Sequence, residues 1–454
     1  MRKKLSGRTI GLNDMNKMSI EISIIMPVYN AGNYLRESMD SLLNQEYKNY
    51  EIICINDGSN DDSLQILNEY VRIDNRIQVI TKEHTNAGDS RNIGLNKARG
   101  KYVIFLDADD IFEKEMLKVV YEKAESESAE IVVFSGDNFL SDTGERIMNS
   151  GLLRSNMVPN QAFCLNDYKG RISFTSTAPW NKLFLKSFIE ENKLEFQSIN
   201  SANDLYFVTL ALLVSNRIAV CDNCLIHYRV NNKNSLQGSS NKSPYDGTSA
   251  LLKLYDELNK RNIYEQCKMD YAERAVSICL YLLKRIDDPI MYKEFYSYLR
   301  TEFFSDVQFD VLTKDSFYNP SLFNELEFIK NNSVYEYLFI KRKMLDAKKS
   351  GRNWLFPFGN IVPKSDILIY GAGDVGKSYY NQIRKTSYCT IKGIIDQKEL
   401  WIDGIKTISP ELVDWDADYI VVAIENENIA INVKRMIADR GINEQKIIWN
   451  IIPI

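Results

Sequence analysis

The chain has 454 residues, of which 44% are hydrophobic and 26% charged, and its formal net charge is −5 at pH 7. This length predicts two or three domains, and the composition is typical of globular proteins. The acidic balance argues against nucleic-acid binding, which usually requires an excess of basic residues. The longest apolar runs fall far short of the ~20 residues that span a bilayer, so we do not expect a membrane-spanning protein.

The cysteines and the N-terminal residues indicate the cellular compartment in which the protein is expected. Seven cysteines, an odd number, are scattered along the chain, which favours reduced thiols in the cytoplasm. Cys221 and Cys224 form a CxxC pair, but no second pair and no suitably spaced histidine completes the four ligands of a zinc site. Residues 1–20 are basic and lack the apolar core of a signal peptide, so we expect a flexible arm. We expect a cytoplasmic protein and leave association with the inner membrane face open.

The first part of the chain alternates between apolar strands and helical patterns. Apolar runs at 22–29, 50–57, 76–81 and 101–107 are separated by stretches with helical spacing, the first two at 31–45 and 62–72. This order predicts an α/β fold with a mostly parallel sheet, whose ligands bind at the carboxyl ends of the strands. Because three strands end at Tyr29-Asn30, Asp57 and Asp107, we expect these residues to meet in one cleft.

The rest of the chain divides by composition. A helix at 113–125 and a strand at 129–136 continue the first pattern, and from about residue 244 helical spacing with many aromatic residues predicts a helical middle region. These aromatic residues form a core or, alternatively, a surface for a membrane or a partner. Prolines and glycines at 350–366 predict a linker. The predicted segments are an arm (1–20), an α/β domain (21–240), a helical linker domain (241–350) and a Rossmann-like domain (355–454).

Negative charge is concentrated at the end of the strand at 101–107. Asp107, Asp109 and Asp110 follow an apolar run directly, and two unit charges about 4 Å apart repel by roughly 1 kcal/mol in water. A divalent cation would compensate, since Mg²⁺ or Mn²⁺ takes oxygen ligands from one or two carboxylates together with substrate phosphates. The alternative is that Asp109 and Asp110 only begin the next helix.

Four segments in this order form a recognisable pattern: MPVYNAGNYLRESMDSLLNQ, YEIICINDGSNDDS, NAGDSRNIGLNKARGKYVIFLDADD and APWNKLF. Together they resemble the motifs of family 2 glycosyltransferases over about residues 20–235. The resemblance implies an inverting, metal-dependent enzyme with the GT-A fold, which moves a sugar from a UDP-sugar donor. It also implies a saccharide or lipid-linked glycan acceptor and a role in bacterial capsule or surface polysaccharide synthesis.

The resemblance also assigns residues to the donor site. The first-strand loop would lie along the nucleoside, Asp57 would bind the uracil ring, and Asp107 would face the ribose or the metal. Arg91 would lie near the base or the phosphates, or alternatively form a structural ion pair with a neighbouring aspartate. The residues matched to the nucleotide-sugar site are Pro27, Val28, Tyr29, Asn30, Asp57, Gly88, Arg91, Asp107, Ala108 and Arg229.

The catalytic and metal residues follow from the same resemblance. An inverting transfer needs a general base, and Asp204 matches its position, although Asn203 stands where the pattern has Glu. The alternative is that Asp204 caps the following helix. Trp180 would stack on a sugar or fill the core. His227 would complete the shell of the cation held by Asp107 and Asp109, and Arg229 would bind diphosphate. A lone histidine also serves structural roles.

The end of the chain carries a second fingerprint. Gly371, Gly373 and Gly376 form GxGxxG after an apolar strand, and Asp396 follows about 20 residues on, as in dinucleotide-binding sites. The glycines bind a second nucleotide or only make a tight turn. A chain acting through this module would be an NAD(P)-dependent oxidoreductase or a regulatory scaffold, and its association into homo-oligomers stays open.

Overall fold

The computed structural model describes residues 20–230, 244–349 and 354–453. The predicted arm therefore lies, except for its last residue, outside the described residues. The chain forms two compact units, Met1–Glu325 and Leu326–Ile454, each of which is described by itself. The finer boundaries near residues 240 and 350 stay a prediction. Within the described residues, no helix combines the length and apolarity that crossing a membrane requires.

The first unit contains a nine-stranded sheet with the order β3-β2-β1-β4-β8-β6-β9-β5, and β7 pairs with β6. The predicted parallel part is present, because β1 pairs in parallel with β2 and β4, and β2 with β3. Beyond β4 the sheet is mixed, since β8 is antiparallel to both β4 and β6. The strands are β1 (Ile22–Val28), β2 (Tyr50–Asp57), β3 (Ile77–Lys82), β4 (Tyr102–Phe105), β5 (Ile111–Phe112), β6 (Ile131–Leu140), β7 (Arg146–Met148), β8 (Lys182–Leu185) and β9 (Ile218–Val230).

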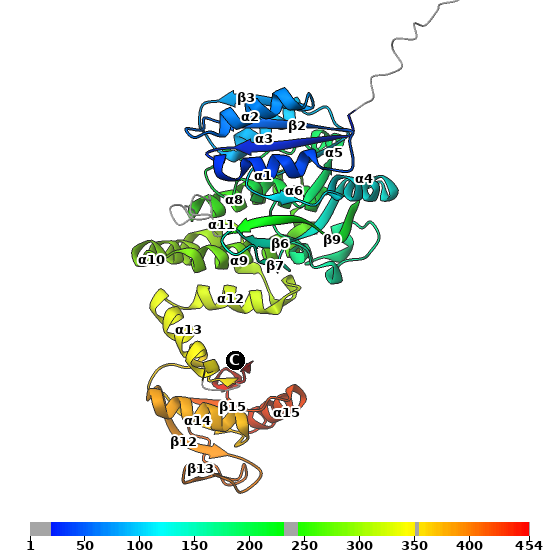
Figure 1. The fold of residues 1–454 in the computed structure, drawn as a ribbon. Helices are drawn as coiled ribbons and strands as arrows, with labels where there is room; N and C mark the ends of the chain where they lie inside the picture. Colours follow the sequence, from blue (N-terminus) through cyan, green and yellow to red (C-terminus); the bar gives the residue numbers. More distant parts are fainter. Residues whose placement is uncertain (1–19, 231–243, 350–353, 454) are drawn as a thin grey trace, which may run out of the picture. The chain divides into compact units, whose positions relative to one another are not determined.

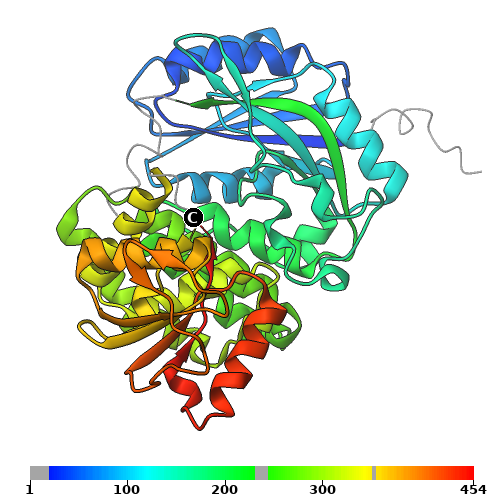
Figure 2. The same cartoon turned by 90° about the horizontal axis from the view of Figure 1, so that it is seen from below.

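Helices cover the parallel part of the sheet on both faces (Figures 1 and 2). Ile24 and Met26 of β1 join one apolar cluster with residues of α1 and α2. On the other face α3 approaches closely, because a Cβ on Gly94 would lie 2.4 Å from Ile25. All residues of β2 are buried, as expected for a strand between two helical layers. The helices are α1 (Gly32–Leu43), α2 (Ser63–Ile73), α3 (Ala87–Lys97), α4 (Met116–Glu127), α5 (Lys186–Glu191) and α6 (Asn203–Val214).

The helical middle region begins within the first unit. Its aromatic residues include fully buried Tyr271, Tyr296 and Phe303, so much of the aromatic pattern is core. Asp270 of α9 accepts a hydrogen bond from the Ile172 backbone N–H at 3.0 Å, which ties the helices to the segment before β8. The elements are η1 (Ser155–Met157), η2 (Leu165–Tyr168), η3 (Ile172–Phe174), α8 (Tyr245–Lys260), α9 (Tyr264–Arg285), α10 (Pro289–Tyr298), the π-helical η5 (Leu299–Phe303), α11 (Phe304–Asp306), η6 (Phe309–Val311) and η7 (Lys314–Ser316).

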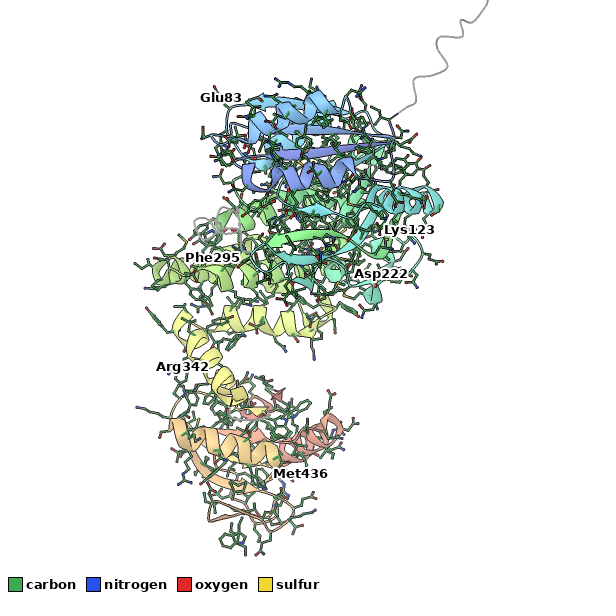
Figure 3. The ribbon with its side chains drawn as sticks, in the orientation of Figure 1. Glu83, Lys123, Asp222, Phe295, Arg342 and Met436 are labelled. Carbon is green, nitrogen blue, oxygen red and sulfur yellow. The ribbon has the colours of Figure 1, made fainter. Side chains whose placement is uncertain are left out.

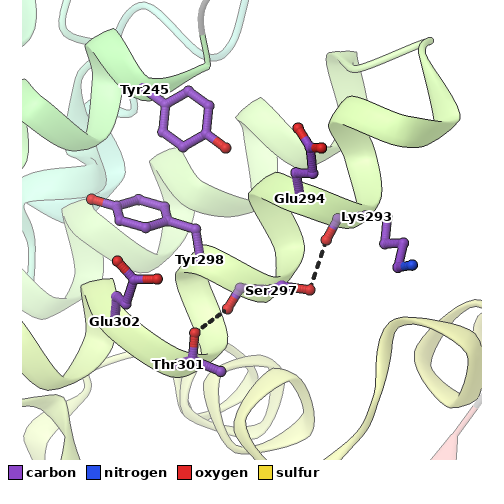
Figure 4. A pocket seen from close by; sticks show the side chains of 7 residues that line it. All are labelled: Tyr245, Lys293, Glu294, Ser297, Tyr298, Thr301 and Glu302. Atoms are coloured by element: carbon purple, nitrogen blue, oxygen red, sulfur yellow. Dashed lines mark hydrogen bonds between the residues drawn. The ribbon is translucent and has the colours of Figure 1, made fainter.

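A pocket of about 480 Å³ lies in this helical region (Figure 4). Tyr245 and Tyr298 both line it and lie next to each other, with ring centroids 5.3 Å apart. The Ser297 and Thr301 hydroxyls bond to helix carbonyls one turn earlier, at 2.8 and 2.9 Å, and so do not point free into the pocket. None of its lining residues belongs to the site predicted from the sequence.

The second unit contains a four-stranded parallel sheet with the order β12-β11-β15-β16. α14 follows β11 and α15 follows β15, an arrangement consistent with a small Rossmann-like domain. α12 crosses the boundary between the units. The elements are α12 (Pro320–Asn331), α13 (Val334–Lys349), β10 (Trp354–Leu355), η8 (Phe358–Asn360), β11 (Asp366–Tyr370), α14 (Asp374–Thr386), β12 (Thr390–Ile395), β13 (Trp401–Ile402), β14 (Ile405–Lys406), β15 (Tyr419–Val422), α15 (Glu427–Ala438), η9 (Glu444–Lys446), β16 (Ile447–Ile448) and β17 (Ile452–Pro453).

Candidate active site

The loops after β1 and β2 are bonded to each other at the carboxyl ends of these strands. Pro27 and Val28 are the last residues of β1. Asn30, in the left-handed region with φ 49°, accepts a hydrogen bond from Asn60 N–H at 2.8 Å, and its own N–H donates to Ser59 Oγ at 3.1 Å. The predicted convergence of the first two strand ends is thus present in the structure.

The end of β3 adds residues that the sequence reasoning missed. The His84 ring stacks on Tyr29, with centroids 3.9 Å apart and an interplanar angle of 15°. Its Nδ1 lies 3.0 Å from Asp57 Oδ2, and Asp57 Oδ1 accepts hydrogen bonds from Lys82 Nζ and from Thr85 N–H. Asp57 is buried and bonds to His84, whereas the stacked rings of Tyr29 and His84 are exposed. Glu83, which precedes His84 in the chain, is labelled in Figure 3. The neighbouring position of β3 in a parallel sheet was the signal that could have identified these side chains.

Asp107, Asp109 and Asp110 follow β4 and lie close enough for their charges to interact. Asp107 and Asp109 are partly exposed, whereas Ala108 and Asp110 are buried. Asp110 Oδ1 accepts a hydrogen bond from Arg229 N–H at 2.9 Å, but Oδ2 has no hydrogen-bond partner within the described part of the chain. Burial raises the pKa of the Asp110 carboxyl well above its ordinary value, and the charges of Asp109 and Asp107 raise it further. This excess of carboxylate oxygens fits a divalent cation, which prefers such ligands.

Arg91 connects this turn to the start of α6. Its guanidinium donates to Asp107 Oδ1 at 2.8 Å and to Asn203 Oδ1 at 2.9 Å, and the residue is only 6% exposed. The predicted ion pair with a neighbouring aspartate is therefore formed. Gly88, on the same helix, contacts the protein closely, since a Cβ there would lie 2.2 Å from the carbonyl oxygen of Gln197.

Asp204 lies in the first turn of α6, but it does not cap the helix. The N-cap is Ala202, with φ 54° and no side-chain cap hydrogen bond. Burial raises the pKa of the Asp204 carboxyl, while the positive charge of Arg91 opposes the increase and the charge of Asp107 adds to it. The same charged groups thus act on the predicted base and on the predicted cation site.

Lys182 is a charged residue inside the fold that the sequence reasoning did not assign. Its side chain is fully buried, and its ammonium donates to the carbonyl oxygens of Ser176 and Ala178 and to Asn181 Oδ1, at 2.8–3.0 Å. Burial lowers the pKa of this ammonium well below its ordinary value. Its positive charge also opposes the increase in the pKa of Asp204.

Trp180 belongs to the apolar core of the first unit. It is 6% exposed and stacks on Tyr228, with ring centroids 5.0 Å apart and an interplanar angle of 10°. The described contacts therefore agree with the core alternative. A contact between Trp180 and a sugar stays a prediction.

Arg229 forms hydrogen bonds to the turn that contains Asp107, Asp109 and Asp110, here called the aspartate turn. Its Nε donates to the Asp109 carbonyl oxygen at 2.7 Å, and its terminal nitrogens donate to Ser141 Oγ at 2.9 Å and Glu37 Oε2 at 2.6 Å. The guanidinium also lies over the Tyr34 ring, 4.6 Å from its centroid. These buried contacts assign Arg229 to positioning the turn, and its binding of a diphosphate stays a prediction.

His227 lies in a different setting from the predicted one. Its Nδ1 is 2.8 Å from Asp137 Oδ1, and its Nε2 is 2.8 Å from Glu113 Oε1. Both ring nitrogens thus face carboxylates other than Asp107 and Asp109. The described contacts give no support to His227 as a ligand of the cation at that pair.

The glycine-rich loop after β11 is shaped by contacts within the second unit. Gly371 has φ 110°, and a Cβ on Gly376 would lie 1.9 Å from the Gly371 carbonyl oxygen, whereas a Cβ on Gly373 would meet nothing within 4 Å. Asp396 Oδ2 accepts a hydrogen bond from Ala372 N–H at 2.8 Å, as a turn-forming residue would. These contacts match the tight-turn alternative, and a second nucleotide site stays a prediction.

We expect Gly376→Ala to destabilise the second unit by about 1–3 kcal/mol, the usual cost of overpacking a tight site. Gly373→Ala, in open space on the same loop, is the matched control and should change stability by less than about 0.5 kcal/mol. Native-state hydrogen exchange of the full chain over residues 366–395 measures both effects. If the backbone amides of the two variants exchanged equally slowly, the loop would not need Gly376 for its fold.

Comparison with known proteins identifies the family. Residues 23–191 match the family model "Glycosyl transferase family 2", a segment that includes Asp57 and Asp109 and ends before Asp204. EpsH of Bacillus subtilis (strain 168), named as a glycosyltransferase, is 30% identical over 269 residues, which are 57% of this chain and 76% of EpsH. The poly(ribitol-phosphate) beta-glucosyltransferase of Bacillus spizizenii is 27% identical over 346 residues, 73% of this chain and 51% of that relative.

Solved structures show the same fold. The crystal structure of S. aureus TarS 1-349 covers 74% of this chain and 94% of its own, with a TM-score of 0.56 and 21% identity. The structure of TarS 1-349 in complex with UDP has a TM-score of 0.52 and 20% identity. The chain belongs to glycosyltransferase family 2 and is a glycosyltransferase with a GT-A fold.

Proposed function

We propose that this glycosyltransferase transfers a sugar, with inversion, from a UDP-sugar to a hydroxyl of a saccharide or lipid-linked glycan and uses Mg²⁺ or Mn²⁺. The observation that carries the proposal is the pair of hydrogen bonds from Arg91, one to Asp107 and one to Asn203. They join the carboxylates that would hold the donor to the helix turn that carries Asp204. A donor and an attacking hydroxyl bound there would lie in one site.

The nucleoside would bind beside the aromatic pair of Tyr29 and His84. Tyr29 is 43% exposed, and one face of its ring is covered by His84. A base would stack on the other face, and Asp57, which lies 3.0 Å from His84 Nδ1, would be the nearby hydrogen-bond acceptor. The complex of the structural relative TarS with UDP supports this choice of nucleotide.

Removing the Tyr29 ring should weaken UDP binding. Base–aromatic stacking contributes about 1–3 kcal/mol per base, so we expect Tyr29→Ala to raise the Kd of UDP by roughly 5- to 150-fold. Calorimetric titration with UDP and Mn²⁺ measures this change. Tyr29→Phe should bind UDP much as the unmodified chain does, and Tyr335→Ala is a control at an exposed tyrosine of the second unit. An unchanged Kd in Tyr29→Ala would remove Tyr29 from the nucleoside site.

Asp107 and Asp109 would hold the cation. The crowding of their charges beside the buried Asp110 carboxyl fits that assignment. A bound divalent cation would neutralise the negative charge that develops on the departing diphosphate. Arg229 would keep the turn in place through its bond to the Asp109 carbonyl. Arg91 would hold Asp107 at the edge of the site through its bond to that carboxylate.

Asp204 would act as the general base. The acceptor oxygen would form a bond to the anomeric carbon on the face opposite to the nucleotide, and the bond from that carbon to the diphosphate oxygen would break. UDP would leave with the bonding electron pair, and the hydroxyl proton would pass to the Asp204 carboxylate. The raised pKa of Asp204 makes it a stronger base than an ordinary aspartate in its ionised form.

A donor screen tests the proposed reaction. Purified full-length chain would be incubated with UDP-Glc, UDP-Gal and their N-acetyl forms, each with Mn²⁺, with Mg²⁺ and with EDTA. We expect UDP release from one donor, its loss in EDTA and its recovery when the cation is restored. Release that continues undiminished in EDTA would contradict the metal dependence. A parallel incubation with a GDP-sugar tests the nucleotide, and nucleotide release from the GDP-sugar alone would contradict the UDP assignment.

We also place the reaction in the synthesis of a bacterial surface polysaccharide, including capsule. The relative named poly(ribitol-phosphate) beta-glucosyltransferase supports a surface polymer as the acceptor, because its similarity extends over 73% of this chain. Polyol-phosphate chains and lipid-linked glycans are therefore the first acceptors to test. Chromatography of the product would show whether the sugar has been added to the polyol-phosphate chain or to the lipid-linked glycan.

A further inference from the structure

The irregular pairing of β6 and β9 brings together three side chains outside the proposed active site. Asp137 lies opposite His227 in the register of these parallel strands, and Ser135 lies opposite Cys224. The register shifts between these pairs, so that β9 contains an extra residue, Leu225. Such a bulge redirects side chains, and it allows Cys224 and His227, three positions apart on a strand, to approach the same carboxylate.

The donor atoms of these three residues form a compact group. One ligand atom each from Asp137, Cys224 and His227 lies within 4.8 Å of the others. The Cys224 sulfur is 3.5 Å from Asp137 Oδ2, and His227 Nδ1 is 2.8 Å from Asp137 Oδ1. His227 and Asp137 are buried, with side chains only 2% and 10% exposed. A thiolate, an imidazole and a carboxylate are together the ligand types that zinc takes in proteins.

Glu113 supplies the outer partner that a metal-binding histidine usually has. Its Oε1 lies 2.8 Å from His227 Nε2, on the side of the ring away from Asp137. A histidine that binds a metal commonly donates its other ring N–H to a carboxylate, which fixes the tautomer and the orientation of the ring. With the proton on Nε2, Nδ1 carries the lone pair that a cation needs.

We propose that Asp137, Cys224 and His227 bind a zinc ion, with Glu113 orienting the imidazole, at a site separate from the cation at Asp107 and Asp109. Zinc binding releases the Cys224 thiol proton to solvent, and a water molecule takes the remaining position. The ion fixes the bulge of β9. The ion would affect the active site through β9. Arg229 lies two residues after His227 on this strand and bonds to the Asp109 carbonyl in the aspartate turn. This proposal revises the expectation that the chain has no zinc site.

Cobalt substitution tests the site through the thiolate itself. The full-length chain would be stripped with EDTA, checked for residual metal by mass spectrometry, and titrated with Co²⁺ alone and then with Zn²⁺. We expect one equivalent of Co²⁺ to give a thiolate-to-cobalt charge-transfer band, which Zn²⁺ displaces. The band separates this site from the all-oxygen site at Asp107 and Asp109, and Asp109→Asn should keep it.

The CxxC pair offers a matched control. Cys221→Ser should retain the band, because the Cys221 sulfur contacts Asn223 and is not one of the three ligands. Cys224→Ser should lose it, and Glu113→Gln should weaken zinc binding by roughly 10- to 100-fold. Circular dichroism checks that each variant is folded. Absence of the band in the unmodified chain, or its persistence in folded Cys224→Ser, overturns the proposal and leaves an imidazole held between two carboxylates.

Discussion

Asp204→Asn should lower kcat by about 10²–10⁴-fold, the usual contribution of a positioned general base, while the KM for the UDP-sugar stays almost unchanged. Asparagine keeps the shape of the side chain but cannot take the acceptor proton. Steady-state UDP release with the donor found in the screen measures kcat and KM separately. Asp142→Asn, at an exposed position after β6, is the matched control and should retain full activity.

The pH profile of the unmodified enzyme gives a second readout for Asp204. The base must be ionised, so kcat should fall as the pH decreases through the pKa of Asp204. Because burial raises that pKa, the fall should begin at a higher pH than for an ordinary aspartate with a pKa of about 3.9. The acidic limb should be absent from the residual activity of Asp204→Asn. A variant that keeps both the rate and the limb would assign the proton to another group.

Asp109→Asn should abolish the dependence of UDP binding on Mn²⁺ and lower kcat/KM by roughly 10²–10³-fold, or about 3–4 kcal/mol of lost transition-state stabilisation. The amide is a weaker ligand than the carboxylate and removes one of the two charges that would hold the cation. Calorimetric titration of UDP with Mn²⁺ and with EDTA measures the effect. The affinity of the variant in Mn²⁺ should equal that of the unmodified chain in EDTA.

The control for this variant is again Asp142→Asn, which should keep the response to Mn²⁺. Thermal unfolding without ligand distinguishes loss of the cation from loss of the fold. Asp109→Asn should unfold at the same temperature as the unmodified chain or above it, because it removes a charge next to buried Asp110. Metal-dependent UDP binding that survives in Asp109→Asn would place the cation elsewhere.

The parallel half of the sheet and the strand ends could be predicted from the sequence because both depend on local patterns. Continuous apolar runs separated by helical spacing specify β1, β2 and β4. In a parallel sheet the carboxyl ends of such strands lie at one edge, so Tyr29, Asp57 and Asp107 could be expected near each other. The bonded loops after β1 and β2 agree with that expectation for the first two strand ends, and the place of Asp107 beside them stays a prediction.

The settings of Arg229 and His227 could not be predicted, because their partners are distant in sequence. Arg229 contacts Glu37 across 192 positions, and His227 contacts Asp137 and Glu113 across 90 and 114. Only the pairing of β9 with β5 and β6 brings these groups together. A motif match gives the residue type at such a position, but it does not tell which side of the strand the residue faces.

The glycine fingerprint illustrates a different difficulty. GxGxxG follows a strand and opens a helix, as the pattern requires, yet Gly376 is explained by its contact with Gly371 in the turn and Gly371 by its contact with Ala423 after β15. Asp396, the acid expected at this spacing, bonds to the backbone of the loop. The spacing alone therefore specifies the turn, and ligand binding requires evidence beyond the motif.

A crystal structure of the full chain with UDP and Mn²⁺ addresses the proposed donor site most directly. The pyrophosphate and the manganese ion should lie against Asp107 and Asp109, with the uracil ring beside Tyr29 and Asp204 facing the open side of the diphosphate. Electron density for UDP at another place, with no metal at Asp107 and Asp109, would contradict the proposed site.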